Sequence, residues 1–438
     1  MNHQEAKDLL QTVLASDELS LIKVEVFRLS WQGKGYNIIS DETGYDHDYI
    51  RKAGSQLWKS LSDSLGQSVT KRNFRPLLEE RLVEASSQRK TVLEYPGAAL
   101  SFSSPFYIER SAEEARAYAE LNNPGCVLRI KGPKKMGKSS LMLRVLDQAE
   151  TDGYHRVSVD LQQADRNILT DLDLLLKWLC LQISAQLGIK AELDDYWNPL
   201  IGSKLSCTNY LQQAILADLD APVVLVINEL NRIFDFEEVS QDFLPLLRSW
   251  FEEAKHNQDM QKLRQVLVYS TEVYVQLDLN LSPFNIGLAI ELSPFSQEQV
   301  AQLGKAYGLN WHADGTLHNP VSILHTAVNG HPYLIQLVLY TLASKEGLIE
   351  SPREEIENIL SMSSKPGGLF HDFLTQLLSD LSANANAMSG FKKLHGDGDQ
   401  KLLPIESYQL ERLGLARIKD GKTLPVNHLA SNFLLDAI

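Results

Sequence analysis

The apolar residues of this chain follow three patterns along its length. From residue 1 to about 85 they recur at helical spacing, interrupted at Gly33, Gly35 and Gly44. Between about 105 and 295, short apolar runs alternate with amphipathic stretches, which predicts strands alternating with helices. After about residue 296 the spacing is helical again. The sequence therefore predicts a helical N-terminal module, an α/β core and a helical C-terminal part.

The alternating middle region predicts a mostly parallel sheet covered by helices on both faces, because strands joined by helices pair in parallel. We expect strands within residues 125–132, 155–162, 222–229, 264–273 and 286–292. We expect helices within residues 138–150, 171–188 and 243–256. Near the C-terminus, Asp420 and Gly421 separate two short runs and predict a hairpin.

Composition narrows the class of protein. The chain has 438 residues, a net charge of -14 and a pI of about 5.3, which argues against general coating of DNA but not against a local basic patch. Three cysteines without paired spacing indicate a reducing compartment and no zinc site. The N-terminus lacks the apolar segment of a signal peptide, and no run of 18 apolar residues is present. We expect a cytoplasmic protein with no membrane partner.

A glycine-rich loop follows the first predicted strand and opens the next helix. It reads G-x-x-x-x-G-K-S at Gly132, Gly137, Lys138 and Ser139, with Ser140 directly after. Successive backbone N–H groups in such a loop, together with the helix N-terminus, form a phosphate site. Lys138 is expected to contact the β- and γ-phosphates, and the Ser139 hydroxyl to ligate Mg²⁺. The loop predicts binding of ATP or ADP with Mg²⁺.

The second motif of such nucleotide sites, an apolar strand followed by Asp and Glu, is altered here. Residues 223–227 are apolar, but Asn228 stands in the aspartate position and Glu229 follows it. An amide offers an oxygen but no charge, and Mg²⁺ prefers charged oxygen ligands. We therefore predict weak Mg²⁺ binding at Asn228 and weak or absent hydrolysis, with Glu229 as the residue that would activate water. The alternative is that Asn228 still orients a metal-bound water and turnover is merely slow.

Two further polar positions follow these motifs. Asn231 is a second amide, and Ser270 and Thr271 end the strand within residues 264–273. Thr271 is a candidate sensor of the γ-phosphate. An ordinary polar strand end explains it equally well.

Several motifs together resemble the bacterial AAA-like proteins of the STAND type, over about residues 105–438. The resemblance rests on residues 104–110, 130–142, 226–234, 266–292 and 329–340. It implies that Tyr107 and Arg110 contact the base or ribose. It also implies that Gly330, His331 and Pro332 form the G-x-P motif of the lid, with Pro332 close to the nucleotide. A simple helix start is the alternative, since proline is favoured in a first helical turn. The family pattern carries acidic residues where this chain has Asn228 and Asn231.

The residue patterns and this resemblance together give the fold class and the domain boundaries that we expect. The fold class is an α/β core, a P-loop NTPase with an ASCE-type, mostly parallel sheet, combined with an all-α N-terminal module, a helical lid and a C-terminal winged helix. The domains are a helix-turn-helix module at 1–85, a linker at 86–104, the core at 105–295, the lid at 296–362 and the winged-helix domain at 363–438. We expect the winged helix to act as part of the lid; reading DNA is the alternative.

The N-terminal module resembles a helix-turn-helix of the LuxR or sigma-like kind. A short helix at 36–43, a turn at Gly44 and a longer helix from about Asp46 give the required spacing, and the longer helix would be the recognition helix. From His47 to Arg75 there are six positive and two negative residues. DNA-binding and protein docking remain open for this module. The candidate DNA contacts are Arg51, Lys52, Lys59, Lys71 and Arg72. Trp58 is expected to pack in the core.

Two functional hypotheses follow. The first is a nucleotide-gated signalling switch that presents or hides the N-terminal module, with a separate effector protein as a partner and nucleotide-dependent homo-oligomerisation. The second is a DNA-binding transcriptional regulator in which the nucleotide domain is a sensor. An active ATPase motor is a third hypothesis, and Asn228 argues against it.

Overall fold

The structure, a computed structural model, describes most of the chain as two compact units, Met1–Val92 and Leu93–Ile438. The described residues are 20–65, 93–270, 283–309, 319–345, 351–396 and 401–438, with Leu10, Leu14, Trp311 and the short pieces 68–71, 73–75 and 77–78. Arg72 and Thr271, both predicted site residues, lie outside them. None of the helices in these ranges combines the length and the apolar character needed to cross a bilayer.

The N-terminal unit contains the predicted run of helices. These are α2 (Leu21–Trp31), α3 (Tyr36–Thr43) and α4 (His47–Leu65). Gly44 ends α3 in the left-handed region at φ +72°, where a glycine carries no steric cost. Asp46 then accepts hydrogen bonds from the backbone N–H groups of Asp48 and Tyr49, which caps the start of α4. The helix boundaries predicted from the sequence are confirmed to within a residue or two.

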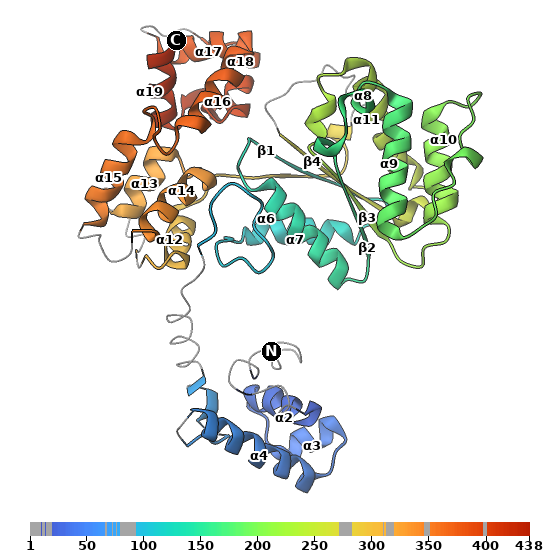
Figure 1. Ribbon diagram of the computed structural model, residues 1–438, viewed down its shortest axis with the longest axis vertical. Helices are drawn as coiled ribbons and strands as arrows, with labels where there is room; N and C mark the ends of the chain where they lie inside the picture. The colour runs from blue at the N-terminus through green and yellow to red at the C-terminus, as the bar shows by residue number, and fades with distance from the viewer. Residues whose placement is uncertain are drawn as a thin grey trace. The chain divides into compact units, whose positions relative to one another are not determined.

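The sheet of the second unit is parallel throughout and has the strand order β2-β3-β4-β1-β5. This confirms the α/β core of the P-loop type. β1, the strand before the phosphate loop, lies between β4 and β5, and two other strands separate it from β2, the next strand in the sequence. The strands are β1 (Val127–Gly132), β2 (His155–Asp160), β3 (Val223–Asn228), β4 (Leu263–Ser270) and β5 (Leu288–Glu291). Helices lie on both faces of the sheet (Figure 1). They are α6 (Ser111–Leu121), α7 (Lys138–Thr151), α8 (Arg166–Leu169), α9 (Leu172–Leu187), α10 (Ser203–Tyr210) and α11 (Glu237–Glu253).

The alternation of side chains along β3 explains why its sequence is uninterruptedly apolar. Val224 and Val226 pack with α6 and α7 in one cluster, whereas Leu225 and Ile227 pack with α9 and α11 in another. Successive side chains of a strand point to opposite faces, and here both faces are covered, so both sets must be apolar. The polar residues Asn228 and Glu229 begin where the strand leaves this double cover.

The C-terminal part of the second unit is helical with one hairpin, and its apolar residues form a cluster of their own. Its helices are α12 (Gln297–Ala306), α13 (Pro320–Val328), α14 (Pro332–Ala343), α15 (Pro352–Ser363), α16 (His371–Ser382), α17 (Ala385–His395), α18 (Pro404–Arg412) and α19 (His428–Ala437). The predicted hairpin is present as the antiparallel strands β6 (Ala416–Lys419) and β7 (Lys422–Pro425). Asp420 and Gly421 form its turn, both with positive φ.

Candidate nucleotide site

The loop between β1 and α7 has the conformation of a phosphate cradle. β1 ends at Gly132 and α7 begins at Lys138. Gly137 precedes the helix in the left-handed region at φ +97°, a conformation that favours glycine, and Lys135 is also left-handed at φ +60°. The loop therefore presents its backbone and the N-terminus of α7 to one side, as the sequence motif predicts.

The Lys138 ammonium is held over the loop by three oxygen atoms. It donates to the carbonyls of Gly132 at 2.9 Å and Pro133 at 2.8 Å, and to the Ser270 hydroxyl at 3.0 Å. Ser270 is the residue that pairs with Gly132 across β4 and β1. Lys138 is 7% exposed, so its charge is compensated within the protein. A phosphate that takes this ammonium must exchange for these partners.

The other two loop lysines contact segments that are distant in the sequence. Lys134 forms a 2.8 Å ion pair with Asp380 of α16, and Lys135 donates to the carbonyl of Gly97 at 2.8 Å. The Ser140 hydroxyl, at the start of α7, accepts from the backbone N–H of Leu100. Residues 93–104, the larger part of the segment expected to be a linker, thus belong to the second unit, and Gly97 and Leu100 bond the phosphate loop and the start of α7.

The phosphate loop opens into a cavity of about 750 Å³. This volume is within the usual range of small-molecule sites. Walls come from three parts of the unit: the sheet domain with its preceding segment, the turn between α13 and α14, and the C-terminal helices with the hairpin. The cavity is lined by residues 97–100, 106–108, 133–140, 291–295, 331–333 and 413–414, with Arg110, Gln162, Glu229, Ser270, Asp380, Arg417 and others.

Tyr107 and Arg110, predicted to contact the base or ribose, both line this cavity. The Arg110 guanidinium donates to the carbonyl of Met136 at 3.1 Å and to that of Ser293 at 3.4 Å, and it lies 4.7 Å from the centre of the Phe295 ring. The Tyr107 hydroxyl donates to Glu114, and burial raises the pKa of this tyrosine. Arg110 thereby ties the phosphate loop to the segment after β5.

The Gly330-His331-Pro332 turn joins the same wall. Gly330 is left-handed at φ +68°, and its carbonyl accepts from the backbone N–H of Phe295 at 2.8 Å. Pro332 is the first residue of α14, so it is both a helix start and a cavity residue. Burial lowers the pKa of His331 to about 4, which outweighs a hydrogen bond to the Lys134 backbone. The imidazole is therefore neutral near pH 7, and it contacts the Phe373 ring at 5.0 Å.

The end of β3 holds its polar groups in a different way. The Asn228 side-chain amide donates to the Asp160 carboxylate at 2.9 Å, and Asn228 is 7% exposed. Asn231 links Glu229 to the end of β4. Its side-chain amide donates to the Glu229 carboxylate at 3.3 Å, and its side-chain oxygen accepts from the Ser270 backbone N–H at 2.9 Å. Glu229 lines the cavity and is left-handed at φ +54°, which is strained for a residue other than glycine.

The donor set fits a Mg²⁺ ion bound together with a nucleotide. Within the described residues there is no group of three His, Cys, Asp or Glu that could form a complete protein cage. Mg²⁺ normally needs none, because it keeps several waters and takes phosphate oxygens with one or two protein ligands. Ser139 lines the cavity, and the Asn228 side-chain oxygen is buried without a hydrogen-bond partner among the described residues. Ser139 would hold the ion and Asn228 would face its water shell.

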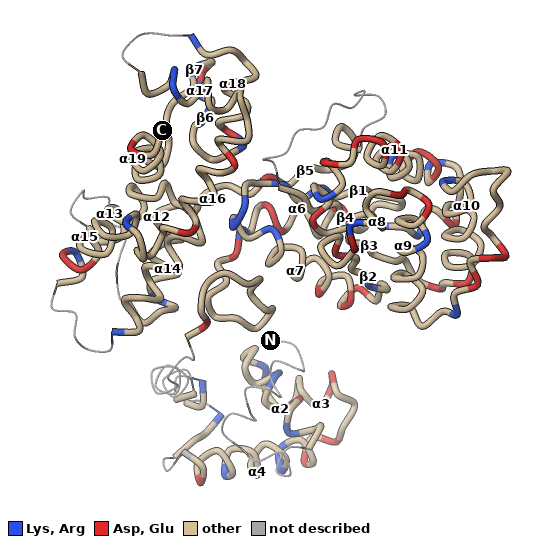
Figure 2. The backbone as a smooth tube through the Cα atoms, turned by 45° about the horizontal axis from the view of Figure 1, so that its top comes forward, with Lys and Arg blue, Asp and Glu red and all other residues tan. Residues whose placement is uncertain are grey.

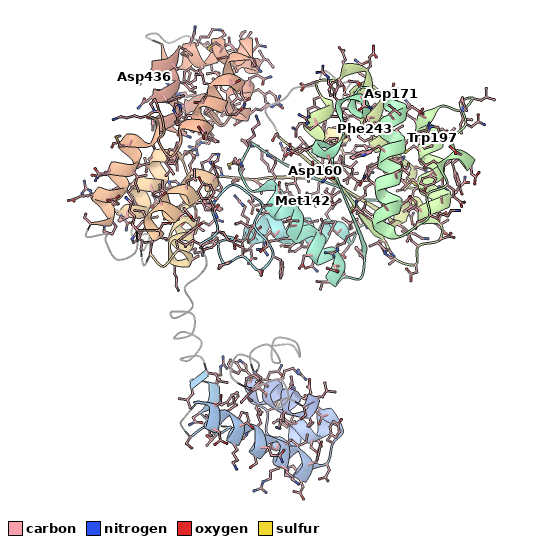
Figure 3. All side chains as sticks on the ribbon, in the orientation of Figure 1. Met142, Asp160, Asp171, Trp197, Phe243 and Asp436 are labelled. Carbon is pink, nitrogen blue, oxygen red and sulfur yellow. The ribbon has the colours of Figure 1, made fainter. Side chains whose placement is uncertain are left out.

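Several polar groups that meet at this site carry no local signal strong enough to have been predicted from the sequence. Gln162, Asp380 and Arg417 line the cavity, and Asp160 (labelled in Figure 3) ends β2 beside Asn228. One of these had a weak signal. Asp160 lies near the end of the strand predicted within residues 155–162, and the carboxyl ends of parallel strands meet at one edge of the sheet, where sites form. The others come from segments too distant in the sequence to be placed by pattern.

The candidate DNA-binding residues all belong to the N-terminal unit. Arg51, Lys52 and Lys59 of α4 are exposed, and charged positions of both signs are spread along this unit (Figure 2). Lys71 packs over the Tyr36 ring at 3.9 Å, and burial lowers its pKa. Trp58 is buried and donates to the Tyr36 hydroxyl, as expected of a core residue.

Comparisons with known families match both units. The model of the family described as "AAA-like domain" matches residues 95–436. The model described as "vWA-MoxR associated protein N-terminal HTH" matches residues 1–81.

Individual relatives are more distant. An uncharacterized WD repeat-containing protein of Synechocystis is 24% identical over 258 residues, which cover 56% of this chain and 21% of that protein, so the chain spans about a fifth of its length. A Walker-type ATPase of Pyrococcus abyssi is similar with a TM-score of 0.49, 14% identity, and coverage of 75% of this chain and 96% of that one. The ORC2 protein of Aeropyrum pernix is similar with a TM-score of 0.42 and 14% identity, and the match covers 80% of this chain and 98% of that one.

Proposed function

Because the chain belongs to the AAA-like domain family, we propose that it is a STAND-like molecular switch that binds ATP or ADP in the cavity beside the phosphate loop. One observation carries the proposal: the wall of the cavity is shared between the sheet domain, the turn at 330–332 and the C-terminal hairpin. A ligand bound to all three would favour the arrangement in which they meet, and differential affinity is what shifts a two-state equilibrium. The C-terminal helices and hairpin would act as a winged-helix lid.

We further propose that hydrolysis is weak or absent. Asn228 contributes no charge at the position where Mg²⁺ is usually neutralised during phosphoryl transfer. Glu229 would be left to orient water, held by Asn231. The output would pass to an effector protein, or to a homo-oligomer that assembles in one nucleotide state.

Calorimetric titration of ATP and ADP, with and without Mg²⁺, tests this proposal. Lys138→Ala should weaken binding of both nucleotides by about 30- to 100-fold, because a charge-assisted contact is worth roughly 2–3 kcal/mol. Lys135→Ala is the matched control, since its ammonium lies on the same loop but donates to Gly97. Wild-type protein that binds neither nucleotide, or Lys138→Ala that binds like Lys135→Ala, would refute the switch.

Turnover is measured on the same proteins. Wild type should release phosphate at a rate at least tenfold below that of Asn228→Asp, on the argument that a charged ligand holds the metal better. Equal rates would contradict the assignment of weak hydrolysis and leave nucleotide binding intact.

A second candidate function, DNA binding by the N-terminal unit, rests on the match of residues 1–81 to a helix-turn-helix family and on exposed Arg51, Lys52 and Lys59. The unit would then be a transcriptional regulator's DNA reader, with the nucleotide domain as sensor. A gel-shift assay with random duplex DNA should detect binding that weakens steeply with salt. Arg51→Ala with Lys52→Ala should reduce both the affinity and the salt slope. No shift at low salt would favour a protein-docking role.

A further inference from the structure

Asp160 and Asn228 face each other across two neighbouring parallel strands. They are register partners at the ends of β2 and β3, and the Asn228 Nδ2 donates to the Asp160 Oδ2 at 2.9 Å. A carboxylate can only accept, so the NH₂ group of the amide must be the side that faces it. The Asn228 Oδ1 is thereby turned away from Asp160. This oxygen is buried and has no hydrogen-bond partner among the residues that the structure describes.

The carboxylate is itself fixed in place. The Asp160 Oδ1 accepts from the backbone N–H of Gln162 at 2.8 Å, in the turn that follows β2. Gln162 lines the cavity, so this turn reaches the same space as the phosphate loop. Ser139, Glu229 and Ser270 line that space too. The fixed carboxylate and the unpartnered amide oxygen therefore stand at the edge of the sheet where a nucleotide-bound cation would lie.

We propose that Asp160 supplies the negative charge that position 228 lacks, and that Asp160 and Asn228 together form the outer shell of a Mg²⁺ site. Asn228 Oδ1 accepts a hydrogen bond from a metal-bound water, and the Asp160 carboxylate fixes the amide and adds the charge. Ser139 and the nucleotide phosphates contact the ion directly. The pair carries one negative charge, and this charge stands on Asp160 behind the amide. It helps to hold the ion but leaves position 228 itself neutral, so the proposed weak hydrolysis is unaffected. This inference rests on the proposed binding of nucleotide.

A purely structural role is the competing explanation: the side-chain bond would only hold β2 to β3. The two roles make different demands on the pair. Strand tethering needs only a side-chain hydrogen bond between the two positions, whichever of them carries the amide donor. A metal site needs the negative charge, and outer-shell partners of a metal typically change its affinity by 10- to 100-fold when they are removed.

The test measures metal affinity in the presence of saturating ATP, using Mn²⁺ electron paramagnetic resonance and Mg²⁺ competition. Asp160→Asn removes the charge but keeps the shape, and its amide can still bond Asn228. It should weaken Mn²⁺ binding by about tenfold or more. Asp165→Asn is the matched control, because Asp165 is an exposed carboxylate in the same connection after β2, outside the cavity lining. It should leave Mn²⁺ affinity unchanged.

An exchange variant, Asp160→Asn combined with Asn228→Asp, completes the test. It retains one carboxylate and one amide at hydrogen-bond distance, so Mn²⁺ affinity should return to within about threefold of wild type. Thermal unfolding in EDTA shows that all variants are folded. Equal Mn²⁺ affinities for Asp160→Asn and Asp165→Asn would overturn the metal site. Wild type that binds ATP with no metal dependence would overturn it too. Wild type that binds no nucleotide would remove both this inference and the proposed function.

Discussion

The phosphate loop and the carboxyl end of β3 lie in the same site, but they are supported by different parts of the protein. The loop is held by distant segments: Lys134 by α16, Lys135 by residue 97, and the carbonyl of Met136 by Arg110. The end of β3 is held by its neighbours in the sheet, Asp160 and Ser270. The loop is therefore tied to α16 and to the segment before the sheet, whereas the end of β3 is bonded within the sheet itself. In the proposed switch, a change in the C-terminal helices would reach the loop before it reaches the end of β3.

Gly330→Ala should have the largest effect on stability, because it disrupts the contact between the turn at 330–332 and the backbone of Phe295. A Cβ at this left-handed position would lie 2.3 Å from the Phe295 carbonyl oxygen. We expect a loss of about 2–4 kcal/mol in the free energy of unfolding of the second unit. Gly308→Ala is the control, since Gly308 is left-handed too but has nothing within 4 Å of its added Cβ. It should cost only about 1 kcal/mol. Equal losses in chemical denaturation would show that the turn is not clamped.

Asn228→Asp probes the sheet side. The new carboxylate would stand at hydrogen-bond distance from Asp160, and like charges this close cannot both ionise without cost. In EDTA the free energy of unfolding should fall by about 1–2 kcal/mol at pH 7.5, and it should recover as pH is lowered and one carboxyl takes up a proton. Mg²⁺ with ATP should also restore it. A variant as stable as wild type in EDTA at pH 7.5 would contradict the close contact between the side chains at positions 228 and 160.

His331 gives a pH-dependent comparison. Its folded-state pKa of about 4 lies below its ordinary value of 6.5, so the unfolded chain takes up a proton in this window and the folded chain does not. Its contribution is complete above pH 6.5 and is lost as the pH falls toward 4. Wild type should lose about 1 kcal/mol more than His331→Gln between pH 6.5 and 4.5, after allowance for partial exposure. Parallel stability curves for the two proteins would argue against a neutral, buried imidazole.

Asp380→Asn should have the smallest effect on stability. The ion pair with Lys134 is partly exposed, and such pairs are worth about 0–1 kcal/mol. Releasing Lys134 should leave its charge available to phosphates, so ATP affinity should rise by roughly two- to fivefold. Glu357→Gln serves as the control, because it breaks another exposed ion pair of the C-terminal part, with Arg353, outside the cavity lining. Unchanged affinity for Asp380→Asn would mean that the C-terminal segment does not compete for the loop.

Much of this site could be predicted because its signals are local in sequence. The phosphate loop, the strand before it and the helix after it occupy adjacent residues, and β3 is apolar throughout because both of its faces are buried. Helices α3 and α4 were predicted for the same reason: Gly44 marks the turn between them.

The contacts that could not be predicted from the sequence join residues that are far apart along the chain. The Asp160–Asn228 bond spans 68 positions and the Lys134–Asp380 bond spans 246. A pattern of apolar residues predicts which face is buried, but not which polar group meets which across two elements. The Ser-, Pro- and Gly-rich composition of residues 86–104 predicted a linker. Residues 97–100 of this segment line the cavity, since small residues also permit close packing against a loop. The prediction for Thr271 concerns a residue outside the described ranges.

The oxygen partners of Lys138 bear on the nucleotide-free protein as well as on affinity. The carbonyls of Gly132 and Pro133 and the Ser270 hydroxyl hold the buried ammonium where no phosphate is bound. A buried charge without such partners would be costly, so these bonds keep the empty loop stable. The same bonds are exchanged when a phosphate binds, so part of the contact energy goes into replacing them. The empty loop is thus preorganised at the expense of some affinity.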